Sequence, residues 1–125
     1  VDVAHNPQAA RELAQWLQAE SVTGVTHAVF AALSDKDVEG VVAALQQDVA
    51  YWHLAGLQDV GARGQDVDAL AARLAASAAA SGSRHTSVAA ALQAVRSAAE
   101  PGDRILVLGS FHTAAEAIRF LRSGG

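Results

Sequence analysis

The stretch VTHAVFAAL, residues 25–33, is an almost uninterrupted apolar run with a glycine before it and Ser-Asp after it. Two further runs have the same character, VAYWHLA at 49–55 and RILVLGS at 104–110. Short apolar runs bounded by Gly, Asp or Ser predict buried strands. Strands that are apolar throughout are typical of a parallel sheet, because the helices that connect parallel strands cover both of its faces.

Amphipathic helices are predicted around these strands. Five segments repeat the apolar spacing i, i+3, i+4, i+7, which gives a helix one buried stripe. The stripes are Ala10/Leu13/Ala14/Leu17, Val38/Val41/Val42/Leu45, Val67/Leu70/Ala71/Leu74, Val88/Ala91/Leu92/Val95 and Ala114/Ala117/Ile118/Leu121. With VDVA at the amino end as a fourth strand and RHT at 84–86 as a short fifth, the alternation predicts a three-layer α/β domain with a mainly parallel sheet.

Helix starts support this assignment. Good N-cap residues precede three of the helices, one of them followed by a proline at the first helical position: Asn6-Pro7, Asp66 and Ser87. At the last helix Thr113 and Glu116 have the spacing of a capping box, and Ser110 competes as the cap.

Composition restricts the class of protein. The length of 125 residues suits one domain, which we place at 1–125. A formal charge of -4 argues against a nucleic-acid partner, and no apolar run approaches the roughly 18 residues of a membrane span. Cysteine is absent, which excludes disulfides and thiolate metal sites and favours the cytoplasm. We expect a monomer with neither nucleic acid nor membrane as a partner.

The candidate site is the carboxyl edge of the sheet. Ligands bind there because strand ends, loops and the free N–H groups of helix N-termini converge. Three loops with polar side chains are expected at this edge, at 2–7, 34–37 and 109–113. Such a rim suits a nucleotide or a phosphorylated intermediate.

Each polar side chain of the rim also has a structural interpretation. Asp2 lies in an apolar strand, so its carboxylate needs a partner or a ligand. His5 alone could bond a loop carbonyl, but a second imidazole, His112, on a neighbouring loop favours function. Ser110 could be an N-cap or a ligand contact. Capping accounts for Asn6, and a solvated turn accounts for Lys36.

Other residues and motifs receive a structural interpretation. Trp16, Trp52 and Tyr51 are predicted to be packing residues. No carboxylate or second imidazole stands at a ligand spacing from the remaining histidines, so no metal site is predicted at His27, His53 or His85. The sequence contains no G-x-x-x-x-G-K-[ST], no G-x-G-x-x-G and no G-x-S-x-G.

With VDVAHNP at 1–7, SDKD at 34–37 and GSFHT at 109–113, the sequence resembles the C-terminal domain of bacterial folylpolyglutamate synthase/dihydrofolate synthase, in the Mur ligase superfamily. The resemblance covers essentially the whole chain. It implies a Rossmann-like domain cut from a longer enzyme, whose N-terminal P-loop domain holds ATP and Mg²⁺ and is the partner of this one.

The resemblance also implies the chemistry. The enzyme activates the carboxylate of dihydropteroate or a folate as an acyl phosphate, which the amine of L-glutamate then attacks. Asp2 would contact ATP, and His5 and Ser110 would hold the glutamate. Asn6, Lys36 and His112 are carried over only as rim residues. No catalytic residue and no metal ligand is assigned within the chain, so we expect the chain alone to be inactive as a ligase.

Two alternatives remain open. The first is another Mur-type ligase that adds an amino acid to a cell-wall precursor. The second is a non-catalytic receiver or nucleotide-binding module of flavodoxin-like topology, for which Asp2, Asp35 and Asp37 would form the acidic cluster. A receiver also needs a lysine on an adjacent strand end, whereas Lys36 stands among the acids in one loop.

Overall fold

The structure, a computed structural model, describes residues 6–20, 22–32, 37–57, 66–109 and 111–122, without the side chains of 111, 112 and 114. Helices and strands alternate along the chain, as the apolar pattern predicts. The expected strand VDVA lies outside the described residues. The elements are α1 (Pro7–Ala19), β1 (Thr26–Ala31), α2 (Val38–Leu45), β2 (Tyr51–Ala55), α3 (Val67–Arg73), β3 (Ser83–His85), α4 (Val88–Ala98), β4 (Arg104–Gly109) and α5 (Phe111–Arg122).

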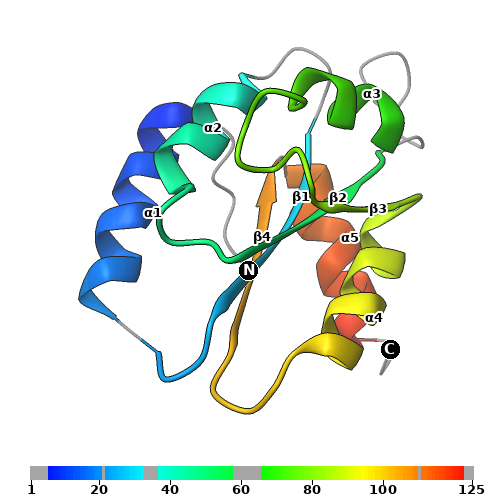
Figure 1. The fold of residues 1–125 in the computed structure, drawn as a ribbon. Coiled ribbons are helices and arrows are strands. Elements are labelled where there is room, and N and C mark those ends of the chain that lie inside the picture. The colour runs from blue at the N-terminus through cyan, green and yellow to red at the C-terminus, as the bar shows by residue number, and fades with distance from the viewer. Residues whose placement is uncertain (1–5, 21, 33–36, 58–65, 110, 123–125) are drawn as a thin grey trace.

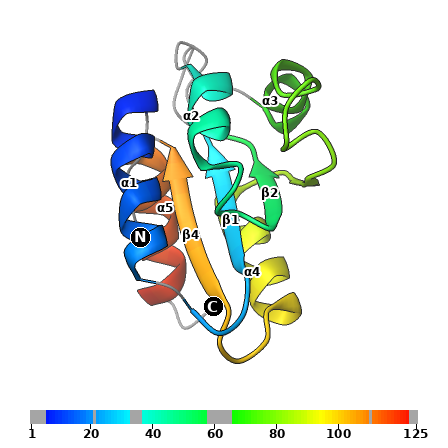
Figure 2. The same cartoon turned by 60° about the vertical axis from the view of Figure 1, so that its left-hand side comes forward.

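The described strands form a parallel sheet in the order β3-β2-β1-β4. Helices α1, α2 and α3 cover one face, and α4 and α5 cover the other (Figures 1 and 2). The three-layer α/β architecture expected from the sequence is therefore confirmed.

The alternation of side chains along β1 explains why the run at 25–33 is almost entirely apolar. Successive side chains of a strand point to opposite faces of the sheet. Ala28 and Phe30 pack into the core under α1, α2 and α3, whereas Val29 and Ala31 pack under α4 and α5. Because both faces are covered, no position along this strand is left for a solvated side chain.

The predicted N-caps are confirmed. Asn6 accepts a hydrogen bond from the Ala9 N–H at 2.8 Å, and Pro7 is the first residue of α1. Asp66 and Ser87 cap α3 and α4 by bonds to the third residue of each helix. Asp37 caps α2 in the same way.

Of the two starts predicted for the last helix, the capping box was wrong, and the other, with Ser110 as the cap, lies outside the described residues. Thr113 and Glu116 do not form a capping box, because α5 already begins at Phe111. The Thr113 hydroxyl donates to the Ala31 carbonyl of β1 at 2.7 Å, and the Glu116 carboxylate accepts from the Ala89 N–H at the start of α4. Both side chains join α5 to other elements.

The predicted stripe of that helix was also partly wrong. Thr113 and Ala117 are buried, but Ile118 and Leu121 are 41% and 46% exposed. Glu116 and Thr113 face α4 and β1 respectively, where their side chains form hydrogen bonds. The inward face of α5 therefore includes the polar residue Thr113, whereas the apolar spacing predicted that Ile118 and Leu121 would face inward.

The two tryptophans and the tyrosine divide between core and surface. Trp52 is buried as predicted, but Trp16 and Tyr51 are 51% and 57% exposed, which corrects their interpretation as packing residues. The guanidinium of Arg104 lies over the Trp16 ring, 5.3 Å from its centroid.

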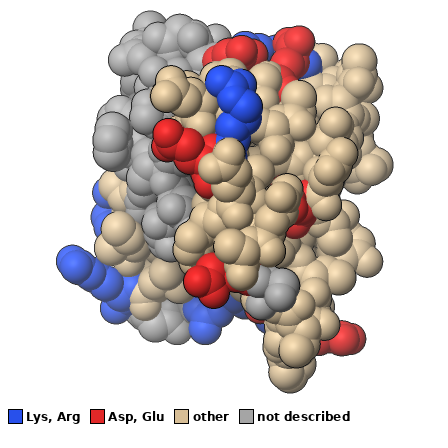
Figure 3. All heavy atoms as spheres, turned by 90° about the vertical axis from the view of Figure 1, so that its left-hand side faces the viewer, with Lys and Arg blue, Asp and Glu red and all other residues tan. Residues whose placement is uncertain are grey.

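Among the described residues on the face that carries α1 and α2, acidic and basic side chains are interspersed, and in places they adjoin (Figure 3). Of the helices described, none combines the length and the apolar character that crossing a membrane requires.

Candidate functional site

The carboxyl ends of β1 and β4 lie side by side at one edge of the sheet. Ala31, the last residue of β1, is paired with Gly109, the last residue of β4. The backbone of Gly109 has a φ of +133°, and a side chain there would overlap the carbonyl oxygen of Ala31. Two of the three loops assigned to the rim therefore leave the sheet next to each other, one after each of these strands.

The starts of α1 and α2 lie at the same edge, towards which β1 and β4 point (Figures 1 and 2). Their first turns are in close contact, since a Cβ on Gly40 would lie 2.6 Å from Cγ of Pro7. The caps Asn6 and Asp37 thus belong to neighbouring helix N-termini. Such an edge offers backbone N–H groups to an anionic ligand.

Most of the predicted site residues fall outside the part of the chain that the structure describes. This holds for Asp2, His5, Lys36 and Ser110, so the expectation that His5 and Ser110 share one rim stays a prediction. His112 is the second residue of α5, but its side chain is not described. Asn6 caps α1, whose start lies at the carboxyl edge, and its role as a rim residue of the site stays a prediction.

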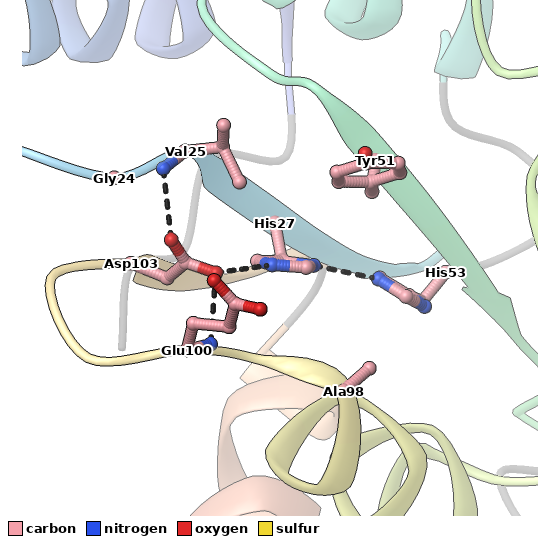
Figure 4. A pocket seen from close by; sticks show the side chains of 8 residues that line it. All are labelled: Gly24, Val25, His27, Tyr51, His53, Ala98, Glu100 and Asp103. Atoms are coloured by element: carbon pink, nitrogen blue, oxygen red, sulfur yellow. Dashed lines mark hydrogen bonds and ion pairs between the residues drawn. The ribbon is translucent and has the colours of Figure 1, made fainter.

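A pocket of about 430 Å³ lies at the opposite, amino edge of the sheet (Figure 4). Its wall combines the start of β1, the start of β2 and the segment between α4 and β4. It is lined by Gly24, Val25, His27, Tyr51, His53, Ala98, Glu100 and Asp103.

A chain of hydrogen bonds runs from this pocket across the sheet. His27 bonds Asp103 through Nε2 at 3.1 Å and His53 through Nδ1 at 3.2 Å. His53 continues to the Ser83 hydroxyl at 2.9 Å, and Ser83 contacts His85 at 2.9 Å. Side chains from β1, β2, β3 and the loop before β4 are thereby joined in one histidine chain, defined as Asp103, His27, His53, Ser83 and His85.

The bonds of the histidine chain are satisfied by neutral rings in one consistent arrangement. With a proton on each Nε2, His85 donates to Ser83, Ser83 to His53, His53 to His27 and His27 to Asp103. Tyr51 stacks on His27, with 5.2 Å between ring centroids. Both ring nitrogens of His27 and of His53 then take part in hydrogen bonds.

Burial and neighbouring groups set the ionisation of the histidine chain. Burial, followed by the charges of His27 and His85, lowers the pKa of His53 from 6.5 to about 4, and burial lowers the pKa of His85. Backbone N–H donors of Glu100 and Val25, and then the hydrogen bond from His27, lower the pKa of the Asp103 carboxyl. At neutral pH the rings of His53 and His85 are uncharged and Asp103 is ionised.

Sequence reasoning missed the histidine chain, since His27 and His53 are 26 positions apart and belong to different strands. One weak signal was available, because His27 and His53 are polar residues inside two of the expected apolar strands, 25–33 and 49–55. Among the residues described, no group of three or more His, Asp or Glu side chains is arranged to hold a metal ion. The chemistry of this cluster is that of a hydrogen-bonded link between strands.

Comparison with known proteins gives matches over nearly the whole chain. Residues 1–111 match the family described as "Mur ligase, glutamate ligase domain". The dihydrofolate synthase/folylpolyglutamate synthase of Escherichia coli (strain K12) is 40% identical over 127 aligned positions, covering 99% of this chain and 28% of that protein.

Solved structures agree with this. E. coli FolC in complex with DHPP and ADP has a TM-score of 0.86 and 37% identity, over 98% of this chain and 28% of that one. A bifunctional folylpolyglutamate synthase/dihydrofolate synthase with Mn, AMPPNP and L-glutamate bound has a TM-score of 0.85 and 38% identity, with the same coverage. The chain thus spans a little over a quarter of the length of these relatives.

Proposed function

Because this chain belongs to the Mur ligase family of glutamate ligase domains, we propose that it is the C-terminal domain of an ATP-dependent amide ligase that adds L-glutamate to dihydropteroate, to reduced folates, or to both. The observation that carries the proposal is the 40% identity to a dihydrofolate synthase/folylpolyglutamate synthase over 99% of the chain. The relatives named above are folate ligases, which favours this function over the alternative within the family, a ligase that acts on a cell-wall precursor.

The proposed role of the domain is to complete the binding site for ATP and glutamate from one side. The carboxyl edge supports this, since the N-termini of α1 and α2 adjoin there and the loops after β1 and β4 start there. Helix N-termini stabilise anionic groups, and ATP and the carboxylates of glutamate are anionic. Asp2 is the proposed ATP contact, and His5 and Ser110 are the proposed glutamate contacts.

The remaining parts of the reaction are assigned to the rest of the ligase. Related structures contain ADP or AMPPNP and, in some, Mn. The described residues include no group of three or more side chains suited to a metal ion, so the proposal places the ligands of the divalent cation in an N-terminal P-loop domain. That domain is the proposed partner, in a monomeric protein of the cytoplasm, where its substrate ATP is available.

The role of this domain in the reaction is positioning. Attack of the glutamate amine on an acyl phosphate forms the amide and releases phosphate. Holding the amine against the acyl phosphate removes the entropic cost of bringing the two together, worth roughly 7–11 kcal/mol in well-oriented model reactions. A rigid rim is a requirement for this contribution.

The test is the activity of the full-length ligase. Purified protein should release phosphate from ATP only when both L-glutamate and dihydropteroate or a reduced folate are present, and mass spectrometry should show the glutamylated product. Phosphate release with a cell-wall precursor in place of the folate would redirect the proposal to the other branch of the family. Absence of glutamate-dependent release with either acceptor would refute it.

A further inference from the structure

The pocket at the amino edge of the sheet (the amino-edge pocket) is lined by two carboxylates and by no lysine or arginine. The lowered pKa of the Asp103 carboxyl keeps it ionised at neutral pH, and this side chain is only 10% exposed. It accepts hydrogen bonds from the N–H groups of Val25 and Glu100 and from His27, whose ring donates without carrying a charge. The Glu100 carboxylate is exposed and, among the described residues, has no hydrogen bond or ion pair. The pocket therefore carries negative charge that no cation in its wall compensates.

Aromatic rings form another part of the wall. Tyr51 stacks on His27 with 5.2 Å between ring centroids, and His27 stacks on His53 with 5.4 Å. In Figure 4 the rings of Tyr51 and His53 lie across the view from the carboxyl groups of Asp103 and Glu100, with His27 between them. Tyr51 is exposed, so a ligand can reach its ring. An aromatic face attracts a cation that lies within about 6 Å of the ring centroid.

The basic residue next in sequence does not fill the amino-edge pocket. Arg104 follows Asp103, but its guanidinium lies over the Trp16 ring, 5.3 Å from the centroid, and donates to the Glu20 carbonyl oxygen. It lines the neighbouring pocket and not this one. The contact with Trp16 illustrates which cation suits an aromatic wall, because a guanidinium is planar, weakly hydrated and keeps its N–H donors at its edge.

We propose that the amino-edge pocket is a binding site for a small ligand that carries a guanidinium group. The group stacks on Tyr51 and donates its paired N–H groups to the Glu100 carboxylate, while Asp103 adds negative potential from the wall. The volume of about 430 Å³ is that of a small-molecule site and leaves room for the rest of the ligand. The site is at the edge opposite the proposed ATP and glutamate site, so the inference does not depend on the proposed function.

The test is a titration with methylguanidinium. The probe is added to the isotope-labelled chain of 125 residues at low ionic strength, where an exposed ion pair is screened least. NMR should show the amide signals of Gly24, Val25 and Tyr51 shifting to saturation. Methylurea, which has nearly the same shape and no charge, is the matched probe and should give no saturable shift.

Variants at exposed positions locate the probe without disturbing the core. Glu100→Gln and Tyr51→Leu should each raise the Kd for methylguanidinium about threefold or more, through the lost ion pair and the lost aromatic face respectively. Tyr51→Phe keeps the ring and should stay within about twofold of wild type. Glu12→Gln, which removes an exposed carboxylate of α1, is the matched control and should leave the Kd unchanged.

Three results would overturn the inference. The first is a set of shifts that never saturate, or that methylurea reproduces. The second is saturable binding whose Kd is unchanged in Glu100→Gln and Tyr51→Leu, because the probe would then occupy another site. The third is a full-length ligase that does not bind the probe although the 125-residue chain does, since the rest of that protein would then fill the pocket in place of a small molecule.

Discussion

At the residue scale, glycines with positive φ differ in what surrounds them. Gly109 lies against backbone, the carbonyl of Ala31, which cannot move without disturbing β1. Gly102, with a φ of +94°, has the hydroxyl of Thr23 as its nearest neighbour, and a side chain can rotate away. An alanine would adopt an unfavourable backbone conformation at either position. Only at Gly109 would its Cβ also overlap rigid backbone.

Gly109→Ala should therefore destabilise the protein by more than about 3 kcal/mol, through strain and overlap together. Gly102→Ala should cost about 1 kcal/mol, mainly from its backbone conformation. Urea unfolding followed by the fluorescence of the buried Trp52 measures both. Equal midpoints for the two variants would show that the contact between Gly109 and Ala31 is not tight.

Individual substitutions also test the roles proposed for the rim. In the full-length ligase, Asp2→Ala should chiefly raise the KM for ATP, while His5→Ala and Ser110→Ala should chiefly raise the KM for glutamate. Losing a hydrogen bond to a charged group corresponds to roughly a tenfold change or more. Steady-state kinetics with each substrate varied in turn provides the measurement, and wild-type constants in all three variants would refute the assignments while leaving the fold intact.

At the scale of elements, the histidine chain links the amino ends of the strands. Parallel strands here are connected through helices, so their amino ends meet only by tertiary contacts. The side chains of the histidine chain come from β1, β2, β3 and the loop before β4. Tyr51 and Glu100 are the other titratable groups that line its pocket. A change of charge in the rings should therefore affect how these strands hold together.

Folding stability should decrease as the pH falls through the range in which His53 titrates. The folded pKa of about 4 lies below the unfolded value of 6.5, so the unfolded state takes up the proton first. The stabilising contribution is complete above pH 6.5 and is lost as the pH falls towards 4. The lowered pKa of His85 acts in the same direction, whereas Asp103, whose pKa lies below 3.8, retains its contribution over this range.

The measurement is the free energy of unfolding in urea at about pH 7.5 and about pH 5, for wild type, His53→Gln and His85→Gln. Wild type should lose stability between the two pH values. The glutamine at position 53 has no charge to gain, so this variant should lose less, and His85→Gln should lie between the two. Identical losses in all three proteins would contradict the assigned pKa of His53.

At the scale of the whole molecule, the domain forms a three-layer sandwich, and its proposed site lies on the edge of the sheet. The core on both faces of the sheet is made from residues of the chain itself. The carboxyl edge, in contrast, contributes loops and helix N-termini that would close against another surface. We therefore expect this domain to fold by itself but to form only part of the binding site for ATP and glutamate.

The 125 residues alone should therefore fold but not catalyse. Circular dichroism should show the mixed α/β content and a cooperative thermal transition, while an assay for phosphate release with ATP, glutamate and a folate should give no signal above the blank. The full-length ligase under the same conditions is the control. Turnover by the isolated chain would show that this domain contains a complete catalytic site.

Sequence by itself determined the alternation of elements, the parallel sheet with two covered faces and the N-caps of α1, α3 and α4. These features follow from local periodicity and from side chains that bond to backbone within three residues, so a single pass along the chain contains them. The motifs at 1–7, 34–37 and 109–113 were likewise sufficient to indicate the family.

Only the tertiary structure decided where several polar side chains find their partners. Thr113 and Glu116 have the spacing of a capping box, yet they bond to Ala31 and Ala89, and His53 reaches residues on two other strands. These partners depend on the register of β1 against β4 and β2 and on the rotation of α5 about its axis. Register and rotation result from packing the whole core at once, and no local spacing specifies them.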